Sequence, residues 1–146
     1  MIAIDTNILV YAHRNESPVH DEALDILRGY CESDRPWAIP WHCCAEFLGI
    51  VTNRRLWRQR ATPMEDAWRQ LEEWASSPSV LLLSETEDFL PLFARMAAHP
   101  RITGGRVHDA RIAAICIAHG VTELLTRDRD FAHFPELRVR DPLIAA

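Results

Sequence analysis

The sequence predicts an α/β fold in which a mainly parallel central sheet of about five strands lies between two layers of helices. Short apolar runs alternate along the chain with longer segments whose apolar residues recur at helical spacing. This alternation is typical of a parallel sheet that helices cover on both faces. A length of 146 residues fits one domain. No repeat, linker or low-complexity stretch divides the chain, so residues 1–146 are expected to form a single domain.

The first third of the chain contains two predicted strands and two predicted helices. Residues 1–4 are fully apolar and end at Asp5, which suits a strand buried on both faces. The pair Ser17-Pro18 predicts a helix start, with serine as the N-cap and proline in the first position. A second short strand is predicted at residues 37–39, closed by proline, and a helix follows at about residues 41–53.

The middle of the chain is predicted to continue the pattern with a helix, a strand and a helix. Residues 62–65, Thr-Pro-Met-Glu, have the form of a capping box with proline in the first helical position. Residues 80–83 predict a third buried strand. Asp88 is a suitable cap for the helix that follows, because Pro91 then falls in its first turn, and residues 99–100 end that helix.

The last third is predicted to form one long helix and two strands. The helix extends over about residues 106–119, and Gly120 is a typical stop signal just past its end. Residues 123–126 predict the fourth strand, and residues 137–140 predict a fifth at an edge of the sheet. In such folds ligands bind outside the carboxyl ends of the strands, so residues that follow strands are the first functional candidates.

Composition and charge restrict the class of protein. The N-terminus lacks the features of a signal peptide, and the longest apolar run, residues 112–118, is too short to span a bilayer. A cytoplasmic location without membrane association is therefore expected. A formal net charge of −5 argues against a general nucleic-acid-coating protein. It is compatible with a nuclease, because bound cations neutralise an acidic metal site. The cysteines lack metal-site spacing and are expected to be reduced thiols.

Four carboxylates are predicted to meet at one edge of the sheet. Asp5 ends the first strand, Glu46 lies on the helix after the second strand, and Asp109 and Asp128 lie in the last third of the chain. Asp109 is in the first turn of its helix, at the head of an apolar stripe, and Asp128 follows the fourth strand. Clustered carboxylates suit Mg²⁺ or Mn²⁺, whose usual chemistry is phosphoryl transfer with a metal-activated water.

Each carboxylate taken alone also has an ordinary structural explanation. Asp5 could cap a helix, and Glu46 could pair with His42 four residues earlier. Asp109 could interact with the positive end of its helix. For Asp128, and more so for Asp130, local ion pairs in a solvated turn are the alternative. The convergence of all four on one edge favours the metal site, with Asp130 assigned to the turn.

At these residues the sequence resembles PIN-domain proteins. The motifs Asp5-Thr6-Asn7, Ala45-Glu46-Phe47, His108-Asp109-Ala110 and Thr126-Arg127-Asp128-Arg129-Asp130-Phe131 match the family's acidic motifs in order and spacing. The resemblance covers essentially the whole chain. Within the family, the stretch from Val107 to Phe131, together with Phe134-Pro135 and Asp141-Pro142, is similar to VapC-like toxins of type II toxin–antitoxin systems.

This resemblance implies a PIN-like three-layer sandwich and a Mg²⁺-dependent endoribonuclease that acts on structured RNA such as tRNA or rRNA. It also implies a homodimer and a cognate VapB-like antitoxin whose tail blocks the cleft. By position, Asp5 and Asp109 would be the main metal ligands, and Glu46 and Asp128 would complete the acidic set directly or through water. Asn7 and Thr126 resemble residues that orient carboxylates or waters. His42 and His108 are expected to be structural.

The basic residues are all arginine, and their roles stay open between two alternatives. Arg106, Arg127 and Arg129 lie next to motif carboxylates, where they could bind RNA phosphates or pair with aspartates. The arginine cluster at residues 54–60, interrupted by Trp57, could supply cations and a stacking surface for bases. It could equally be a solvated helix end.

Two other functions compete with the nuclease. A Mg²⁺-dependent phosphatase also places an aspartate after a first buried strand. Such enzymes usually have a second aspartate where this chain has Asn7, and they usually need a lysine, which this chain lacks. The other alternative is a catalytically silent PIN-like module that binds RNA or protein. The presence of all four acidic residues argues against it.

Overall fold

The central sheet has five strands, and all of them are parallel. The computed structural model describes residues 1–144. The strand order is β3-β2-β1-β4-β5, and each neighbouring pair is parallel. The strands are β1 (Ile2–Ile4), β2 (Trp37–Pro40), β3 (Val80–Leu83), β4 (Glu123–Leu125) and β5 (Arg138–Arg140). The predicted mainly parallel sheet of about five strands is confirmed.

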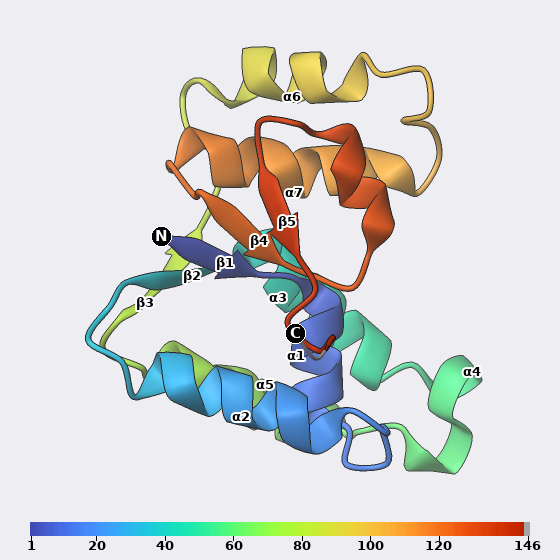
Figure 1. The fold of residues 1–146 in the computed structure, drawn as a ribbon. Helices are drawn as coiled ribbons and strands as arrows, with labels where there is room; N and C mark the ends of the chain where they lie inside the picture. The colour runs from blue at the N-terminus through green and yellow to red at the C-terminus, as the bar shows by residue number, and fades with distance from the viewer. Residues whose placement is uncertain (145–146) are drawn as a thin grey trace.

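Helices lie on both sides of this sheet. They are α1 (Thr6–His13), α2 (His20–Cys31), α3 (Trp41–Val51), α4 (Arg54–Trp57), α5 (Met64–Ala75), α6 (Phe89–Ala97) and α7 (Arg106–Ala118), with short 3₁₀ helices η1 (Arg58–Arg60) and η2 (Arg129–His133). In Figure 1, α6 and α7 lie above the sheet and α2 and α5 lie below it. The predicted three-layer sandwich is therefore confirmed. None of the helices in residues 1–144 has the length and apolar content that a membrane crossing requires.

The central strands are more deeply buried than the edge strands. Ala3, Ile4, Leu124 and Leu125 in β1 and β4 are fully buried, as expected for strands with helices on both faces. The prediction that residues 80–83 form a buried strand is wrong in one respect, because β3 is an edge strand and Leu81 is 48% exposed. The predicted edge position of the fifth strand is confirmed by β5.

Two predicted helix caps are wrong because their hydroxyls have other partners. Ser17 Oγ accepts the N–H of Val19 at 3.4 Å and forms a turn, so α2 begins at residue 20 rather than at residue 18. Thr62 Oγ1 is 3.0 Å from His13 Nε2 and accepts a hydrogen bond from Arg14 at 3.3 Å. The Thr62 side chain therefore joins α1 to the loop before α5 instead of capping α5.

The arginine cluster at residues 54–60 forms α4 and η1, and contacts with α1 and α3 leave Trp57 half-buried. Its indole N–H donates to the carbonyl of Ile50 at 2.8 Å, and the guanidinium of Arg14 lies 3.9 Å from the centre of its ring. Buried Arg14 also donates to the carbonyl of Arg60 at 2.9 Å. Trp57 therefore anchors this segment to α1 and α3, and the arginines on either side of it are exposed.

Candidate active site

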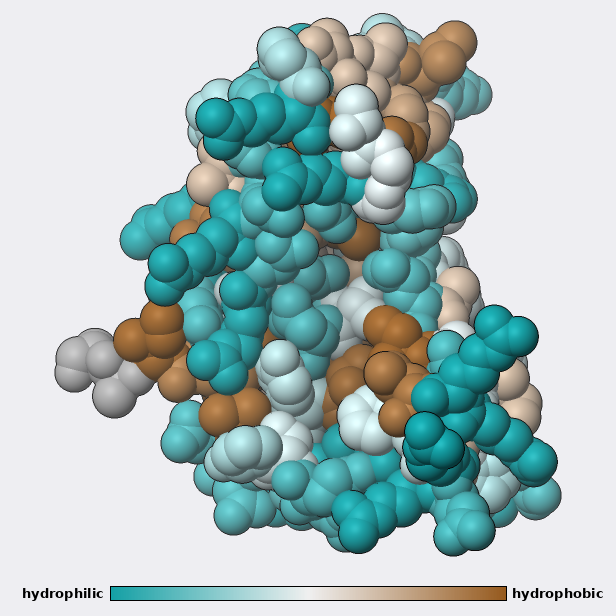
Figure 2. All heavy atoms as spheres, turned by 90° about the vertical axis from the view of Figure 1, so that its right-hand side faces the viewer, coloured by the Kyte–Doolittle hydropathy of each residue, from teal (hydrophilic) through white to brown (hydrophobic). Residues whose placement is uncertain are grey.

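The four predicted carboxylates lie together at the carboxyl ends of β1 and β4. Asp5, Glu46, Asp109 and Asp128 all line one cavity of about 250 Å³. Hydrophilic residues cover most of the face seen in Figure 2, with apolar residues exposed between them in several places. The sheet edge predicted from the sequence thus does bring together acids that are up to 123 residues apart in the chain.

Asp5 is buried and held by hydrogen bonds on both of its oxygens. Oδ1 accepts the backbone N–H of Thr6 at 2.8 Å, which caps α1, and it lies 3.6 Å from Cys43 Sγ. Oδ2 accepts the hydroxyl of Thr126 at 2.7 Å and the side-chain amide of Asn7 at 3.4 Å. Burial raises the pKa of Asp5 to about 6, against the lowering effect of the hydrogen bond from Thr126. Asp5 is therefore both a helix cap and a member of the acidic group.

Asn7 and Thr126 connect the end of β1 to the end of β4. The Asn7 amide donates to Thr126 Oγ1 at 3.0 Å, and Asn7 Oδ1 accepts the backbone N–H of Arg127 at 3.3 Å. Thr126 Oγ1 also accepts the backbone N–H of Asp128 at 2.9 Å. These bonds fix the orientation of Asp5 and of the turn that carries Asp128, which is the arrangement expected for Asn7 and Thr126.

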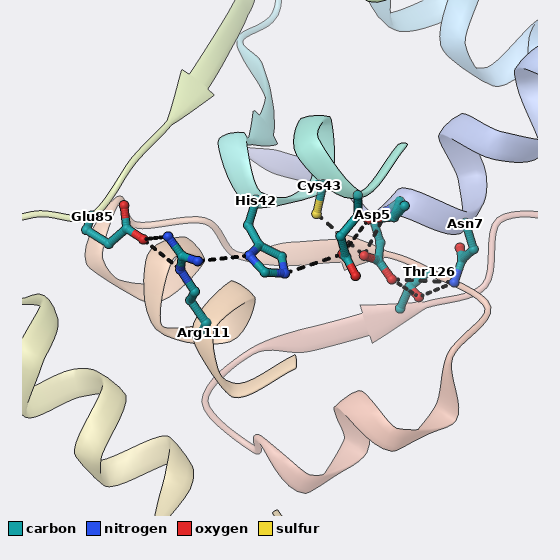
Figure 3. A network of polar contacts seen from close by, with 9 residues as sticks. Asp5, Asn7, His42, Cys43, Glu85, Arg111 and Thr126 are labelled. Carbon is teal, nitrogen blue, oxygen red and sulfur yellow. Dashed lines mark hydrogen bonds and ion pairs between the residues drawn. The ribbon is translucent and has the colours of Figure 1, made fainter. Parts of the chain in front are cut away.

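Glu46 faces the cavity from the second turn of α3. Its Oε1 accepts the hydroxyl of Thr6 at 2.8 Å and lies 3.6 Å from Nε2 of His42 (Figure 3). His42 does lie beside Glu46, as expected, but the hydrogen bond of Glu46 is made with Thr6. Burial lowers the pKa of His42, so the imidazole is neutral near pH 7. Glu46 Oε2 has no hydrogen-bond partner among residues 1–144.

Asp130 joins the acidic group, which the sequence reasoning missed. Carboxylate oxygens of Asp109, Asp128 and Asp130 lie within 4.8 Å of one another. Asp128 caps η2 by accepting the backbone N–H of Asp130 at 2.9 Å, and this tight turn brings both carboxylates to the same side. Asp130 also pairs with Arg106 at 3.4 Å, so the ion pair expected of the turn exists beside the site. The alternation Asp-Arg-Asp was the available signal.

Asp109 carries the strongest electrostatic signal in the cavity. Its pKa is raised to about 7, first by burial and then by the negative charges of Asp128, Asp5 and Glu46. Perturbed carboxylates of this kind cluster at functional sites. Because the charges repel one another without a cation, the donor set fits a divalent metal ion.

The chemistry of the donors favours a hard cation over a soft one. Sγ of Cys43 lies with Asp5 and Glu46 in a second group of closely spaced ligand atoms. Burial raises the pKa of Cys43 well above its usual value, so in the metal-free protein the thiol is protonated and faces Asp5 Oδ1 as a hydrogen-bond donor at 3.6 Å. The remaining donors are carboxylate oxygens, which suit Mg²⁺ and Mn²⁺.

Two of the three arginines expected near the site are paired with aspartates. Arg106 pairs with Asp130, and Arg127 Nε lies 3.3 Å from Asp141. Arg129 is exposed and makes no ion pair within the described part of the chain. Arg129 is therefore the member of this set that is most available to a phosphate.

Comparison with known proteins identifies the family. The PIN domain family model matches residues 2–137. Ribonuclease VapC43 of Mycobacterium tuberculosis is 33% identical over 143 residues, covering 98% of this chain and 96% of its own length. Ribonuclease VapC48 of the same organism is 30% identical over 138 residues, covering 94% of each protein.

Solved structures share the fold at lower sequence identity. VapBC2 from Rickettsia felis, bound to a promoter DNA fragment, aligns with a TM-score of 0.70 and 21% identity over 96% of this chain and 98% of that chain. Mycobacterium tuberculosis VapC20, described as a Sarcin-Ricin loop cleaving toxin, aligns with a TM-score of 0.67 and 14% identity over 90% and 93%. Together with the acidic motifs and the parallel sheet, the family match and the identity to curated relatives show that this chain belongs to the PIN-domain family and, within it, to the VapC ribonucleases.

Proposed function

We propose that this VapC ribonuclease is a metal-dependent endoribonuclease, the toxin of a toxin–antitoxin pair, that hydrolyses phosphodiester bonds in structured RNA. One observation carries the proposal: Asp5, Glu46, Asp109 and Asp128, from four separate segments, line one cavity. Carboxylates in such an arrangement repel one another, and a divalent cation relieves that repulsion. Mg²⁺ is the proposed cofactor, and Mn²⁺ has the ligand preferences to replace it.

The residues of the cavity have distinct proposed roles. Asp5 and Asp109 hold the cation, and Glu46 and Asp128 complete the set directly or through water. Thr126 and Asn7 keep Asp5 in place through their bonds to Oδ2. When bound, a divalent cation lowers the pKa of an attacking water and offsets negative charge on the phosphate. The free Oε2 of Glu46 is available to orient that water.

The proposed partners are a VapB-like antitoxin, RNA and a second copy of the chain. VapBC complexes from Rickettsia felis and nontypeable Haemophilus influenzae contain chains of this fold, which supports an antitoxin partner. The description of VapC20 as a toxin that cleaves the Sarcin-Ricin loop supports structured RNA, such as tRNA or rRNA, as the substrate class. A cytoplasmic homodimer completes the proposal.

Arg129 is expected to contact an RNA phosphate. Arg129→Gln should raise KM for RNA about 3- to 10-fold and leave kcat unchanged, because a phosphate contact away from the reacting atoms contributes equally to the ground state and the transition state. It should also make binding less sensitive to salt, lowering the salt slope by about 1. Steady-state kinetics at several salt concentrations measure both effects. The matched control is Arg69→Gln on α5, where the arginine is exposed and pairs with Glu65 and Asp66.

The two competing functions lose support but give clear alternative outcomes. A phosphatase would need a lysine that the chain lacks. A silent binding module would not need the acidic cavity. Incubation of the protein with total bacterial RNA, with Mg²⁺, with Mn²⁺ and with chelator, alongside Asp5→Asn, separates the endoribonuclease from the silent module. Discrete fragments that require both metal and Asp5 support the endoribonuclease. RNA binding without cleavage in any condition would favour the silent module.

A further inference from the structure

A line of side chains outside the acidic cavity extends from Glu85 through Arg111 to His42 (Figure 3), and His42 lies beside Glu46. It begins at Glu85, in the loop after β3, whose carboxylate accepts hydrogen bonds from Arg111 Nε at 2.7 Å and from Arg111 Nη2. Arg111 Nη1, on α7, lies 3.2 Å from Nδ1 of His42 on α3. His42 Nε2 then lies 3.6 Å from Glu46 Oε1. Three elements that are distant in sequence thus contribute to one connected path.

The chemistry of arginine determines where the proton of His42 lies. A guanidinium only donates hydrogen bonds, so Nδ1 of His42 must be the acceptor and carries no proton. The imidazole proton is therefore on Nε2. Nε2 is buried and has no hydrogen-bond partner among residues 1–144, and Glu46 Oε1 is the acceptor it faces. A buried donor without a full partner costs free energy, so its position beside Glu46 calls for a functional explanation.

The ring of His42 is also held in orientation by packing. His108 stacks on it with a centroid separation of 5.2 Å and an interplanar angle of 25°. The side chain of His42 is only 9% exposed. The hydroxyl of Thr6, the first residue of α1, donates a hydrogen bond to Glu46 Oε1, the oxygen that His42 Nε2 also faces. Oε1 therefore faces two donors, and Oε2 is left free.

We propose that His42 is a positioning residue for Glu46. Arg111, held by Glu85, selects the tautomer of His42 that presents Nε2–H to Glu46. His42 and Thr6 together then fix Oε1 and leave Oε2 for the cation or a water at the cavity. The inference rests on the proposed metal-dependent function and assigns a role to three residues outside the acidic motifs.

Three substitutions at His42 separate positioning from packing. His42→Leu removes both ring nitrogens, and His42→Asn keeps a polar group near Nδ1 but none near Nε2. His42→Gln places an amide N–H near the position of Nε2. The affinity for Mn²⁺, measured by titration calorimetry on the full chain, should fall about 10- to 100-fold for the leucine and asparagine variants. His42→Gln should stay within about threefold of the wild type.

Kinetics and a second site supply independent readouts. In RNA cleavage the leucine and asparagine variants should lose kcat in the same proportion and keep KM, because Glu46 acts on the reacting centre. Arg111→Met should weaken Mn²⁺ binding by a smaller factor, since it frees the tautomer of His42 but leaves the ring in place. His119→Leu is the control, because His119 bonds to the carbonyl of Ser84 outside the cavity.

The outcomes are decisive in both directions. Wild-type Mn²⁺ affinity and kcat in His42→Asn, or a glutamine variant as impaired as the leucine variant, would overturn the positioning role. A wild-type protein that neither binds Mn²⁺ nor cuts RNA would overturn the proposed function, and the positioning role with it. If the leucine variant fails to fold, the asparagine and glutamine variants still separate the two explanations.

Discussion

Asp109→Asn is expected to abolish RNA cleavage and, in chelator, to raise the melting temperature. The carboxylate of Asp109 lies beside those of Asp128 and Asp130, and its pKa is raised to about 7 by burial and by neighbouring negative charges. Asparagine has the same shape but no charge, so it removes a proposed metal ligand and relieves repulsion at once. Cleavage should fall more than about 100-fold, because losing only an outer partner of a ligand already costs 10- to 100-fold.

Thermal melting in chelator and an RNA cleavage assay measure the two effects on the same protein sample. Each kcal/mol of relieved repulsion should raise the melting temperature by about 3 °C or more. Asp21→Asn is a matched control, because Asp21 is an exposed aspartate in the first turn of α2, as Asp109 is in the first turn of α7. It should keep full cleavage and should not raise the melting temperature. An Asp109→Asn protein that cuts at the wild-type rate contradicts the assignment.

The metal-free protein should lose stability as the pH rises from about 4 to about 7. Asp5 has a pKa of about 6 and Asp109 of about 7, against 3.8 for an unperturbed aspartate. The folded state therefore binds these protons more tightly than the unfolded state does. The stability they contribute is fully present below about pH 4 and is lost as the pH rises through 6 and 7. For buried Asp5, the difference between 3.8 and about 6 corresponds to about 3 kcal/mol.

A comparison with variants isolates these two groups from the other titrating side chains. At pH 4 the Asp5→Asn and Asp109→Asn variants should have melting temperatures close to that of the wild type. As the pH rises to about 7, their melting temperatures should exceed that of the wild type by a growing margin. Asparagine also caps helices well, so Asp5→Asn retains the start of α1. Addition of Mn²⁺ at pH 7.5 should stabilise the wild type more than either variant. If the melting temperatures of variant and wild type differ by the same amount at every pH from 4 to 7, titration of Asp5 and Asp109 does not cause the difference.

The sheet and the four acidic positions could be predicted from the sequence because both depend on local pattern. Asp5 and Asp128 follow the apolar runs that became β1 and β4, and parallel strands bring their carboxyl ends to one edge. Asp109 was marked by the apolar stripe on its own helix. Each of these signals lies within a few residues, so periodicity and strand ends are sufficient to find them.

Side-chain contacts between residues that are far apart in the chain could not be predicted from local pattern. Thr62 matches a capping box, but its hydroxyl is shared by His13 and Arg14, which are about fifty residues earlier. The contact of Arg14 with one face of the Trp57 ring, 43 positions away in the chain, has no local signal either.

The path that ends on Glu46 shows the same limit. It connects Glu85, Arg111 and His42 over 26 and 69 positions. No spacing rule along the chain relates these residues, because side-chain contacts between the loop after β3, α7 and α3 bring them together. Asp130 was assigned to an ion-paired turn, and the local sequence does not show that this turn directs its carboxylate toward those of Asp109 and Asp128.

The proposed function requires that the cavity lined by Asp5, Glu46, Asp109 and Asp128 holds a divalent cation. A crystal structure of the protein grown with Mn²⁺, with anomalous diffraction to locate the ion, tests it most directly. We expect an anomalous peak in that cavity, within ligand distance of carboxylate oxygens of both Asp5 and Asp109. An empty cavity at saturating Mn²⁺, or a peak only at acidic residues elsewhere on the surface, would contradict it.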